Sequence, residues 1–104
     1  MQDIRLRPSW QPALIDIART CYLAPNEPTY FAEWASLDLR VKRYAEGISA
    51  AKHCIEIAPE YADGYLLLGL LQMENKQKEE ARKNLEKAKE LGDTRAEGYL
   101  KKLK

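Results

Sequence analysis

The stretch Tyr61-Ala62-Asp63-Gly64-Tyr65-Leu66-Leu67-Leu68-Gly69-Leu70-Leu71-Gln72-Met73 decides the fold of this chain. Its residues favour a helix that is apolar on nearly every side, whereas a surface helix shows a single apolar stripe. The stretch is too short to cross a bilayer, which takes about 20 apolar residues. The sequence therefore predicts a buried central helix that is covered by the rest of the chain, by a partner, or by both.

Length and composition point to one all-α domain over residues 1–104. A chain of 104 residues is long enough to bury one continuous core. Ala, Leu, Glu and Lys are abundant and favour helices, and no hairpin turn is flanked by alternating residues. The net charge is +1 with both signs interspersed, so the basic face typical of a nucleic-acid or membrane-surface binder is missing.

The sequence also bears on the compartment and on the state of the two thiols. The sequence contains no signal-peptide core and no transmembrane run, so the expected location is the cytoplasm, although a domain cut from a longer exported protein would look the same. Cys21 and Cys54 lie in apolar helical runs without a second Cys or His at metal-binding spacing. We expect buried thiols, with a disulfide or a ligand pair as the alternative.

An internal repeat organises the rest of the chain. The dipeptide Ala24-Pro25 recurs 34 residues later as Ala58-Pro59, and each copy closes an apolar helical run. A third run ends before Gly92, which suits a helix C-terminus because glycine adopts a left-handed conformation at no steric cost. The three predicted helices that end in register cover Trp10–Leu23, Tyr44–Ile57 and Lys78–Leu91.

The remaining helices fall between and after these three. One is expected from Pro28 to about Val41, with Asn26 as its candidate capping residue, and the central stretch forms the next. A final short helix over Thr94–Leu103 has one apolar side, which suits a terminal cap of a stacked array. The predicted units are 8–27, half of a repeat, then the repeats 28–61 and 62–95, and the capping helix 96–104.

The period and its residues resemble the tetratricopeptide repeat (TPR). In the second unit, Tyr65, Leu68-Gly69, Ala81, Leu85 and Ala88 match the family pattern, whereas Gln72 and Asp93 depart from it. In the looser first unit the matching residues are Phe31, Trp34-Ala35, Gly47, Ala51, Cys54 and Pro59. The resemblance covers about residues 10–103 and implies a short superhelix of antiparallel helix pairs that serves as a non-catalytic protein-interaction module.

Two features of the pattern carry structural expectations. Gly69 and Ala35 should sit where paired helices approach most closely, facing Ala81 and Gly47. Asp38 stands where the family has Tyr, and an unpaired buried carboxylate is costly. We expect a local change of register to place Asp38 in solvent; if it faces inward, it needs a hydrogen-bond or charge partner.

The resemblance also implies a concave groove lined by the first helix of each repeat. Chaperone-binding TPR proteins line this groove with Lys, Arg and Asn that hold a peptide carboxylate. Ala32, Ser36, Leu66 and Leu67 stand at such positions here, so the groove is expected to take a helix or an apolar peptide instead. Thr29, Glu33 and Glu74 belong to the lining, and the predicted partner-binding residues are Ala32, Ser36, Leu39, Arg40, Asp63, Leu66, Leu67, Leu70 and Met73.

Self-coverage is the alternative to a separate ligand. The terminal helix or another copy of the chain would then cover the groove leucines. The first half-repeat also lacks its leading helix, which would leave the face Trp10, Ala13, Leu14, Ile17 and Cys21 partly bare. A homodimer through the Trp10–Leu23 helix, or packing against a missing part of a longer chain, would cover that face.

No residue pattern indicates catalysis. His53 is the only histidine, and it has no Ser, Cys or acid partner at motif spacing. The chain has no Gly-rich phosphate loop, no His-Glu-x-x-His and no Cys-x-x-Cys. We therefore expect neither an enzyme nor a cofactor or metal site, and the expected partner is a protein or peptide rather than nucleic acid or membrane.

Overall fold

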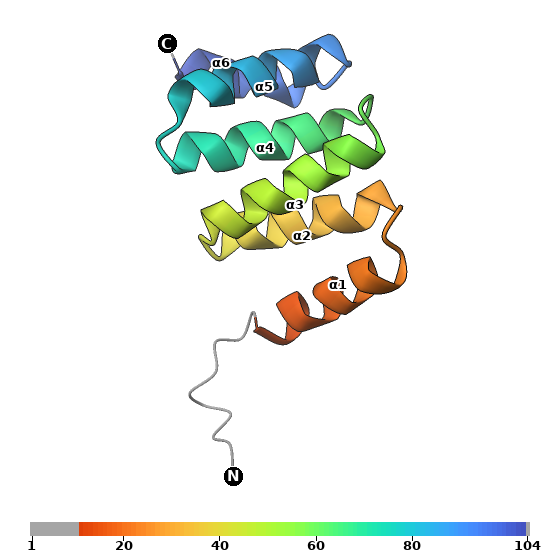
Figure 1. The fold of residues 1–104 in the computed structure, drawn as a ribbon. Coiled ribbons are helices and arrows are strands. Elements are labelled where there is room, and N and C mark those ends of the chain that lie inside the picture. Colours follow the sequence, from red (N-terminus) through yellow and green to blue (C-terminus); the bar gives the residue numbers. More distant parts are fainter. Residues whose placement is uncertain (1–10, 104) are drawn as a thin grey trace.

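The computed structural model describes residues 11–103, which form helices stacked as antiparallel pairs (Figure 1). No strand occurs within this range, so the predicted all-α repeat fold is confirmed. Trp10 lies outside the described residues, as does the side chain of Ala13. The helices are α1 (Gln11–Leu23), α2 (Pro28–Arg40), α3 (Tyr44–Ile57), α4 (Ala62–Glu74), α5 (Lys78–Glu90) and α6 (Arg95–Lys102).

The helices pack mainly against their neighbours in the chain. α2 pairs with α3 and α4 pairs with α5, while the contact of α3 with α4 joins the two pairs. α1 packs against α2 at one end of the array and α6 packs against α5 at the other, as Figure 1 shows. α2 also contacts α4, so the first helices of the two repeats lie side by side and share one surface.

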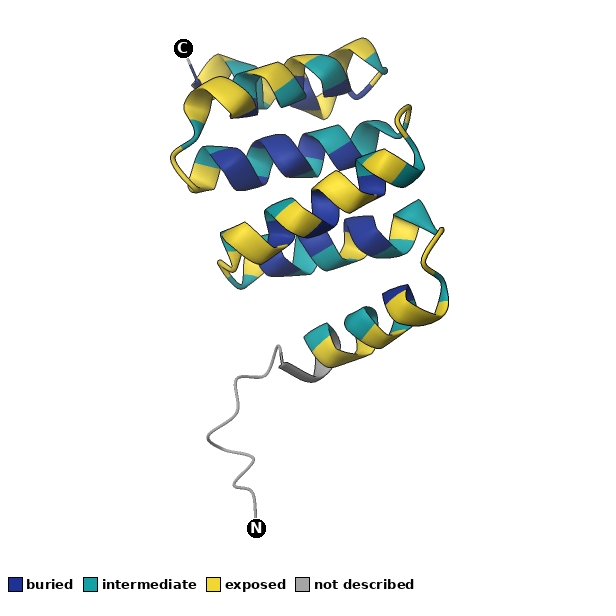
Figure 2. Ribbon diagram, viewed as in Figure 1, coloured by how far each residue is buried: buried dark blue, intermediate teal, exposed yellow. Residues whose placement is uncertain are grey.

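α4 is the central buried helix that the sequence predicts. Most of α4 is buried or half-buried, whereas much of α5 is exposed (Figure 2). Leu66 packs with Ala81 and Leu85 of α5, whereas Leu68 and Leu71 pack with residues of α2 and α3. α4 therefore contributes to two hydrophobic clusters, one on each side of it.

Two glycines allow helices to approach closely. A Cβ atom on Gly69 would lie 2.8 Å from Leu85 Cγ and 3.2 Å from the carbonyl oxygen of Ala81, which confirms the predicted contact with α5. A Cβ on Gly47 would lie 2.6 Å from Leu71 Cδ2 and 3.0 Å from Asp38 Cβ. Gly47 therefore makes room for Leu71 of α4 where α3 meets α4. The sequence predicted only that Gly47 faces Ala35 of α2.

Three helices end in the same hydrogen-bonded turn. After α2, the Arg43 N–H donates to the Asp38 carbonyl at 2.8 Å, and equivalent bonds close α4 and α5. This turn requires a left-handed residue, which is Gly92 after α5, with φ 105°, as the sequence predicts. After α2 and α4 the position is taken by Lys42 (φ 65°) and Lys76 (φ 64°), where a side chain makes the conformation less favourable.

The expected cap at Asn26 is wrong. α2 is preceded by Glu27 in extended conformation, and no side chain forms a capping hydrogen bond there. Pro28 occupies the first position of the helix, so Asn26 lies one residue too early, in the turn. The Thr29 hydroxyl instead donates to Glu27 Oε1 at 3.0 Å.

Replacing Gly69 by Ala should destabilise the protein by about 1–2 kcal/mol. The added methyl meets Leu85 and backbone, and this overpacking exceeds the roughly 1 kcal/mol that alanine gains in a helix. Gly98 is the matched control, because no atom lies within 4 Å of its added Cβ. Gly98→Ala should stabilise by about 0.5–1 kcal/mol in urea unfolding. Equal stabilisation by both changes would contradict the close approach at Gly69.

Replacing Lys76 by Gly should raise the free energy of unfolding by about 0.5–1 kcal/mol, since glycine adopts the left-handed conformation without a steric penalty. Lys83→Gly, inside the exposed side of α5, should lower it by about 1 kcal/mol. Thermal unfolding of both variants measures this contrast in sign. A loss of stability in Lys76→Gly would show that the lysine side chain contributes more than the strain costs.

Candidate functional site

The first helices of the repeats form an open cavity of about 510 Å³ together with α6. Leu39 of α2 and Leu67 and Leu70 of α4 are half-buried there, so their side chains remain accessible from the cavity. The lining consists of Thr29, Ala32, Glu33, Ser36, Leu39, Tyr61, Asp63, Leu66, Leu67, Leu70, Arg95 and Tyr99. We call this surface the inner groove.

A second cavity of about 450 Å³ continues the groove toward the C-terminal ends of α2 and α4. It shares Leu39, Leu70 and Tyr99 with the first cavity and adds the two predicted residues Arg40 and Met73. The structure therefore places all nine predicted partner-binding residues along one surface. Whether they bind a partner stays a prediction.

The predicted residues differ in how they contribute to this surface. Ala32 is 6% exposed and Leu66 is 3% exposed, and both belong to hydrophobic clusters. They form the floor of the groove rather than contacts available to a ligand. Leu39, Leu67 and Leu70 are half-buried, so part of each side chain is left open.

The terminal helix covers one flank of the groove. Ala96, Tyr99 and Leu100 of α6 belong to the same hydrophobic cluster as Leu66, Leu70 and Met73 of α4, and Tyr99 lines the groove with Leu70. Part of the expected self-coverage is therefore present within one chain. Arg95 and Tyr99 line the groove although the sequence prediction omitted them. The apolar side of the last helix was visible in the sequence, but its position beside α4 depends on how the array curves.

An ion-pair cluster lies at the end of the groove near the start of α4. Arg95 binds Asp93 with Nε 3.0 Å from Oδ1 and Nη2 2.8 Å from Oδ2, and Nη2 also contacts Asp63 Oδ1. The Arg95 hydrogen bonds lower the pKa of Asp93. Asp93, at the family's proline position, also accepts the Arg95 backbone N–H at 3.0 Å. Arg95 is the cation of the first cavity's lining and is already paired with two carboxylates.

The opposite end of the groove is basic. Arg40, Lys42 and Lys102 line the second cavity beside one acid, Glu74. The Lys102 ammonium lies 5.4 Å from the centre of the Tyr99 ring, within the range of a cation–π contact. The groove thus runs from an internally paired end, through an apolar middle, to an end with accessible cations.

Comparison with known proteins agrees with this architecture. Residues 62–91 match the family model described as tetratricopeptide repeat. A search of curated protein sequences finds no significant match. The chain has a TPR-like fold.

Solved TPR structures share its fold at low sequence identity. The first TPR domain of human RPAP3 is 23% identical with a TM-score of 0.86, and the alignment covers 90% of this chain and 76% of that domain. The first TPR of Spaghetti (RPAP3), solved with the HSP90 peptide SRMEEVD, gives 0.85 at the same identity and coverage. MamA residues 41–end from Desulfovibrio magneticus RS-1 gives 0.82 at 23% identity, with 90% of this chain and 54% of that chain covered.

The expectation that Asp38 reaches solvent is wrong. The side chain of Asp38 is fully buried between α2 and α3 with no change of helical register. Neither carboxylate oxygen accepts a hydrogen bond from a described residue, and the Arg43 Nε lies 3.8 Å from Oδ1. Burial raises the pKa of Asp38 to about 6, with Arg43 opposing and Glu46 adding to this rise.

The second repeat shows how the same position is satisfied with a different residue. Gln72 is equivalent to Asp38 by the 34-residue period, and its Oε1 accepts a hydrogen bond from Asn84 at 2.7 Å. The residue equivalent to Asn84 in the first repeat is Ala50, which has no side-chain donor. The TPR-like array therefore contains one complete and one incomplete copy of this polar contact.

The other candidate reactive groups occupy packing positions. Cys21 and Cys54 are free and buried, and burial raises the pKa of Cys54 to about 11, so its thiol remains protonated near neutral pH. The His53 ring lies 4.3 Å from the Phe31 ring, and its Nδ1 lies 3.7 Å from Glu56. No group of metal-binding side chains gathers within residues 11–103, and none of the described helices could cross a membrane.

α1 is only partly covered by the rest of the described chain. Of the face expected to be partly bare, Cys21 is buried and Ile17 packs beside it against Phe31 of α2, while Leu14 and Ile17 are half-buried. The most exposed large apolar residues of α1 are Ile15 (49%), Tyr22 (84%) and Leu23 (75%). A homodimer through this helix stays a prediction.

Stability should depend on pH through Asp38. The folded pKa of about 6 exceeds the usual 3.8, so the native state binds the proton more tightly between these values. The free energy of unfolding should fall by up to about 3 kcal/mol as pH rises from about 4 to above 6. Asp38→Asn removes this charge, so the difference between variant and wild type in urea unfolding should grow over that interval. A pH-independent difference would contradict the buried carboxylate.

Proposed function

We propose that this TPR-like chain is a protein-interaction module whose inner groove binds an amphipathic helix or an apolar peptide. Tetratricopeptide repeats are generally a non-catalytic protein-interaction fold, which supports the broader role. The observation that carries the narrower proposal is the apolar middle of the groove, where Leu39, Leu67 and Leu70 stay half-exposed beside Tyr99. A ligand with apolar side chains would complete their burial.

The groove chemistry favours this ligand over an acidic peptide. The RPAP3 domain of similar fold was solved with the peptide SRMEEVD, which is rich in carboxylates. In this chain, Ala32, Ser36 and Leu67 occupy groove positions without offering a cation. Arg95 is already bound to Asp63 and Asp93, so recruiting it to a ligand carboxylate would break existing ion pairs.

Specificity would come from the ends of the groove. Accessible Arg40, Lys42 and Lys102 line the second cavity, while Glu33 and the paired Asp63 line the first. A helix with a central apolar stripe and an acidic residue toward the second cavity fits this distribution better than a uniformly charged peptide. Charges at such positions would influence orientation and association rate more than affinity.

The test is fluorescence anisotropy with a labelled amphipathic helical peptide of about 15 residues whose leucines recur at helical spacing. Its scrambled sequence and SRMEEVD serve as comparison peptides. We expect the helical peptide to bind at least about tenfold more tightly than either. Equal affinity for the scrambled peptide, or tighter binding of SRMEEVD, would overturn the proposal.

Substitutions locate the binding surface. Ser36→Arg places a long charged side chain in the groove at a half-buried position, and should weaken peptide binding at least about tenfold. Ser49→Arg, on the exposed side of α3, is the matched control and should bind normally. Leu70→Glu should also lose binding while circular dichroism retains the helical signal. If Ser36→Arg binds like wild type, the ligand does not occupy this groove.

A further inference from the structure

The second cavity collects positive charges from parts of the chain that are far apart in the sequence. Arg40 lies in the last turn of α2 and Lys42 in the turn that follows it, whereas Lys102 ends α6. Among the described residues, Glu74 is the one carboxylate in the lining, so three cations and one acid leave an excess of two positive charges. Because the whole chain has a net charge of only +1, this excess is a local concentration of charge.

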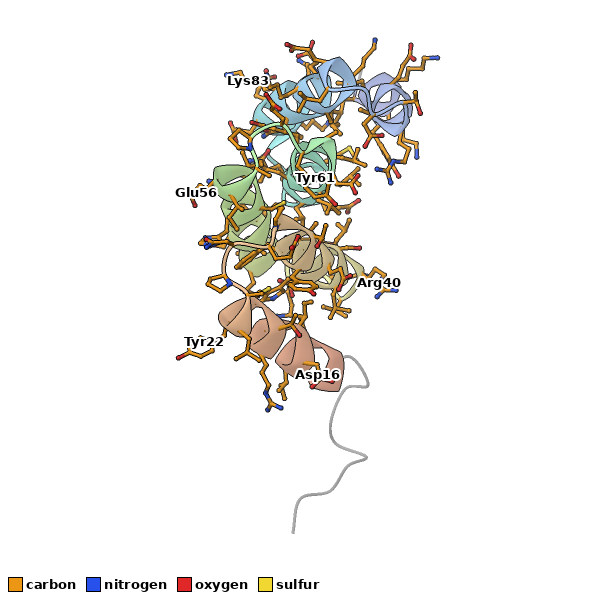
Figure 3. The ribbon with its side chains drawn as sticks, turned by 90° about the vertical axis from the view of Figure 1, so that its right-hand side faces the viewer. Asp16, Tyr22, Arg40, Glu56, Tyr61 and Lys83 are labelled. Atoms are coloured by element: carbon orange, nitrogen blue, oxygen red, sulfur yellow. The ribbon has the colours of Figure 1, made fainter. Side chains whose placement is uncertain are left out.

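The three cations are available to a ligand. Within residues 11–103, none of them forms an ion pair, and none of their side chains donates a hydrogen bond. Lys102 lies over the Tyr99 ring, 5.4 Å from its centre. All three side chains are exposed, and Figure 3 shows Arg40 on the side of the molecule opposite Glu56.

The end of α2 does not use these donors. Cations are common near helix C-termini because the last carbonyl groups carry partial negative charge. At the end of α2, however, the carbonyls of Leu37, Asp38 and Leu39 already accept the backbone N–H groups of residues 41–43. The turn therefore satisfies the backbone, and the side chains of Arg40 and Lys42 line the cavity instead.

An apolar wall joins this cavity to the inner groove. Leu39, Leu70 and Tyr99 are half-buried and line both cavities. An apolar wall beside charges of one sign concentrates their electric field on a bound anion. A helical ligand that covers Leu39 and Leu70 would therefore bring its next turn, about 5 Å further along, to the cations.

Carboxylates limit the extent of the positive region. Arg40 also lines a cavity of about 490 Å³ between α1 and α2, and Asp16 and Glu33 are exposed there. Glu33 and Asp63 line the inner groove. A nucleic acid or an anionic lipid surface would extend over these acids, since such binders need a broad basic face. The charge distribution therefore fits one compact anion.

We propose that the second cavity binds a phosphorylated serine or threonine of the groove ligand. A phosphate monoester carries roughly −1.5 to −2 charges near neutral pH, which matches the excess of two positive charges, whereas a carboxylate neutralises only one. The Arg40 guanidinium can hold two phosphate oxygens, while Lys42 and Lys102 supply point charges. This inference rests on the proposed function, because the peptide in the inner groove carries the phosphate. Phosphorylation of the partner would then control its binding.

The test compares labelled amphipathic helical peptides by fluorescence anisotropy. The parent peptide carries a serine one turn beyond its last groove-facing leucine, and its variants carry phosphoserine or glutamate there. A second series has this position at the other end, so that both directions of the helix are covered. In one series, phosphoserine should tighten binding at least about tenfold and glutamate at most about threefold. Phosphoserine on the polar face at the same end gives a peptide of equal charge, which should bind like the parent.

Two lysines at equivalent positions provide a matched pair of variants. Lys42 and Lys76 are both exposed and both left-handed, but of the two only Lys42 lines the second cavity. Lys42→Gln should reduce the gain from phosphoserine at least about threefold, whereas Lys76→Gln should keep it. Lys102→Gln and Lys101→Gln form the same contrast on α6. Glu74→Gln should increase the gain, because it removes the acid that lines the cavity.

The outcomes separate this inference from the proposed function. If none of the peptides binds, both are overturned. If the parent binds but phosphoserine adds no more than glutamate, or no more than phosphoserine on the polar face, only the phosphate site is overturned. A gain that survives in both Lys42→Gln and Lys102→Gln would also overturn it. A single-stranded oligonucleotide should not compete with the phosphopeptide, and competition that depends on Lys42 would assign the cavity to a nucleic acid instead.

Discussion

The close packing of α4 against α3 and α5 determines how the two helix pairs are placed relative to each other. Gly69 removes the side chain that would separate α4 from α5, and Gly47 makes room for Leu71 at the junction with α3. Because these contacts set how each helix pair meets the next, they also set the position of the half-exposed leucines on the inner groove. A repeat protein transmits such local spacing along the array, since each unit contacts chiefly its neighbours.

The two repeats differ in whether the polar residue at one equivalent buried position has a hydrogen-bond partner. At one equivalent position, Gln72 has Asn84 as a partner, whereas Asp38 is buried opposite an alanine position and relies on Arg43 at 3.8 Å. Lys42 and Lys76, at the ends of α2 and α4, likewise adopt the left-handed conformation that a glycine such as Gly92 adopts more readily. Burial between α2 and α3 keeps Asp38 in place despite its cost. Stability of the first repeat therefore rests more on apolar packing than on satisfied polar groups.

Much of the fold was predictable because it follows from periodicity. The recurring Ala-Pro pairs, the apolar central helix and Gly92 are local signals, and they place the helices to within a residue or two. Asp38 could not be placed this way, because burial of a carboxylate depends on whether the backbone can turn it outward, and α2 keeps its register. Asn26 was predicted to cap α2, but the helix begins at Pro28, so the capping position is Glu27.

The candidate groove was predictable in part. Matching positions to the repeat pattern found the residues of α2 and α4 because equivalent positions share a face. Arg95 and Tyr99 were missed because α6 reaches the groove only through the curvature of the array. Similarly, the sequence identified α1 as incompletely covered but did not mark Ile15, Tyr22 and Leu23 as its most exposed apolar residues. The amphipathic pattern marks Cys21 and Ile17 as apolar without indicating that α2 already covers them.

The cluster of Asp63, Arg95 and Asp93 makes the two ends of the array unequal in mechanical terms. The Arg95–Asp63 ion pair ties α6 back to α4, one helix beyond the neighbour on which α6 packs, and Asp93 holds Arg95 in position for it. α1 has its main contact with α2 alone. In a chain of nearest-neighbour units, fluctuations start where a terminal unit has the fewest links. Within residues 11–103, α1 should therefore separate from the array more readily than α6.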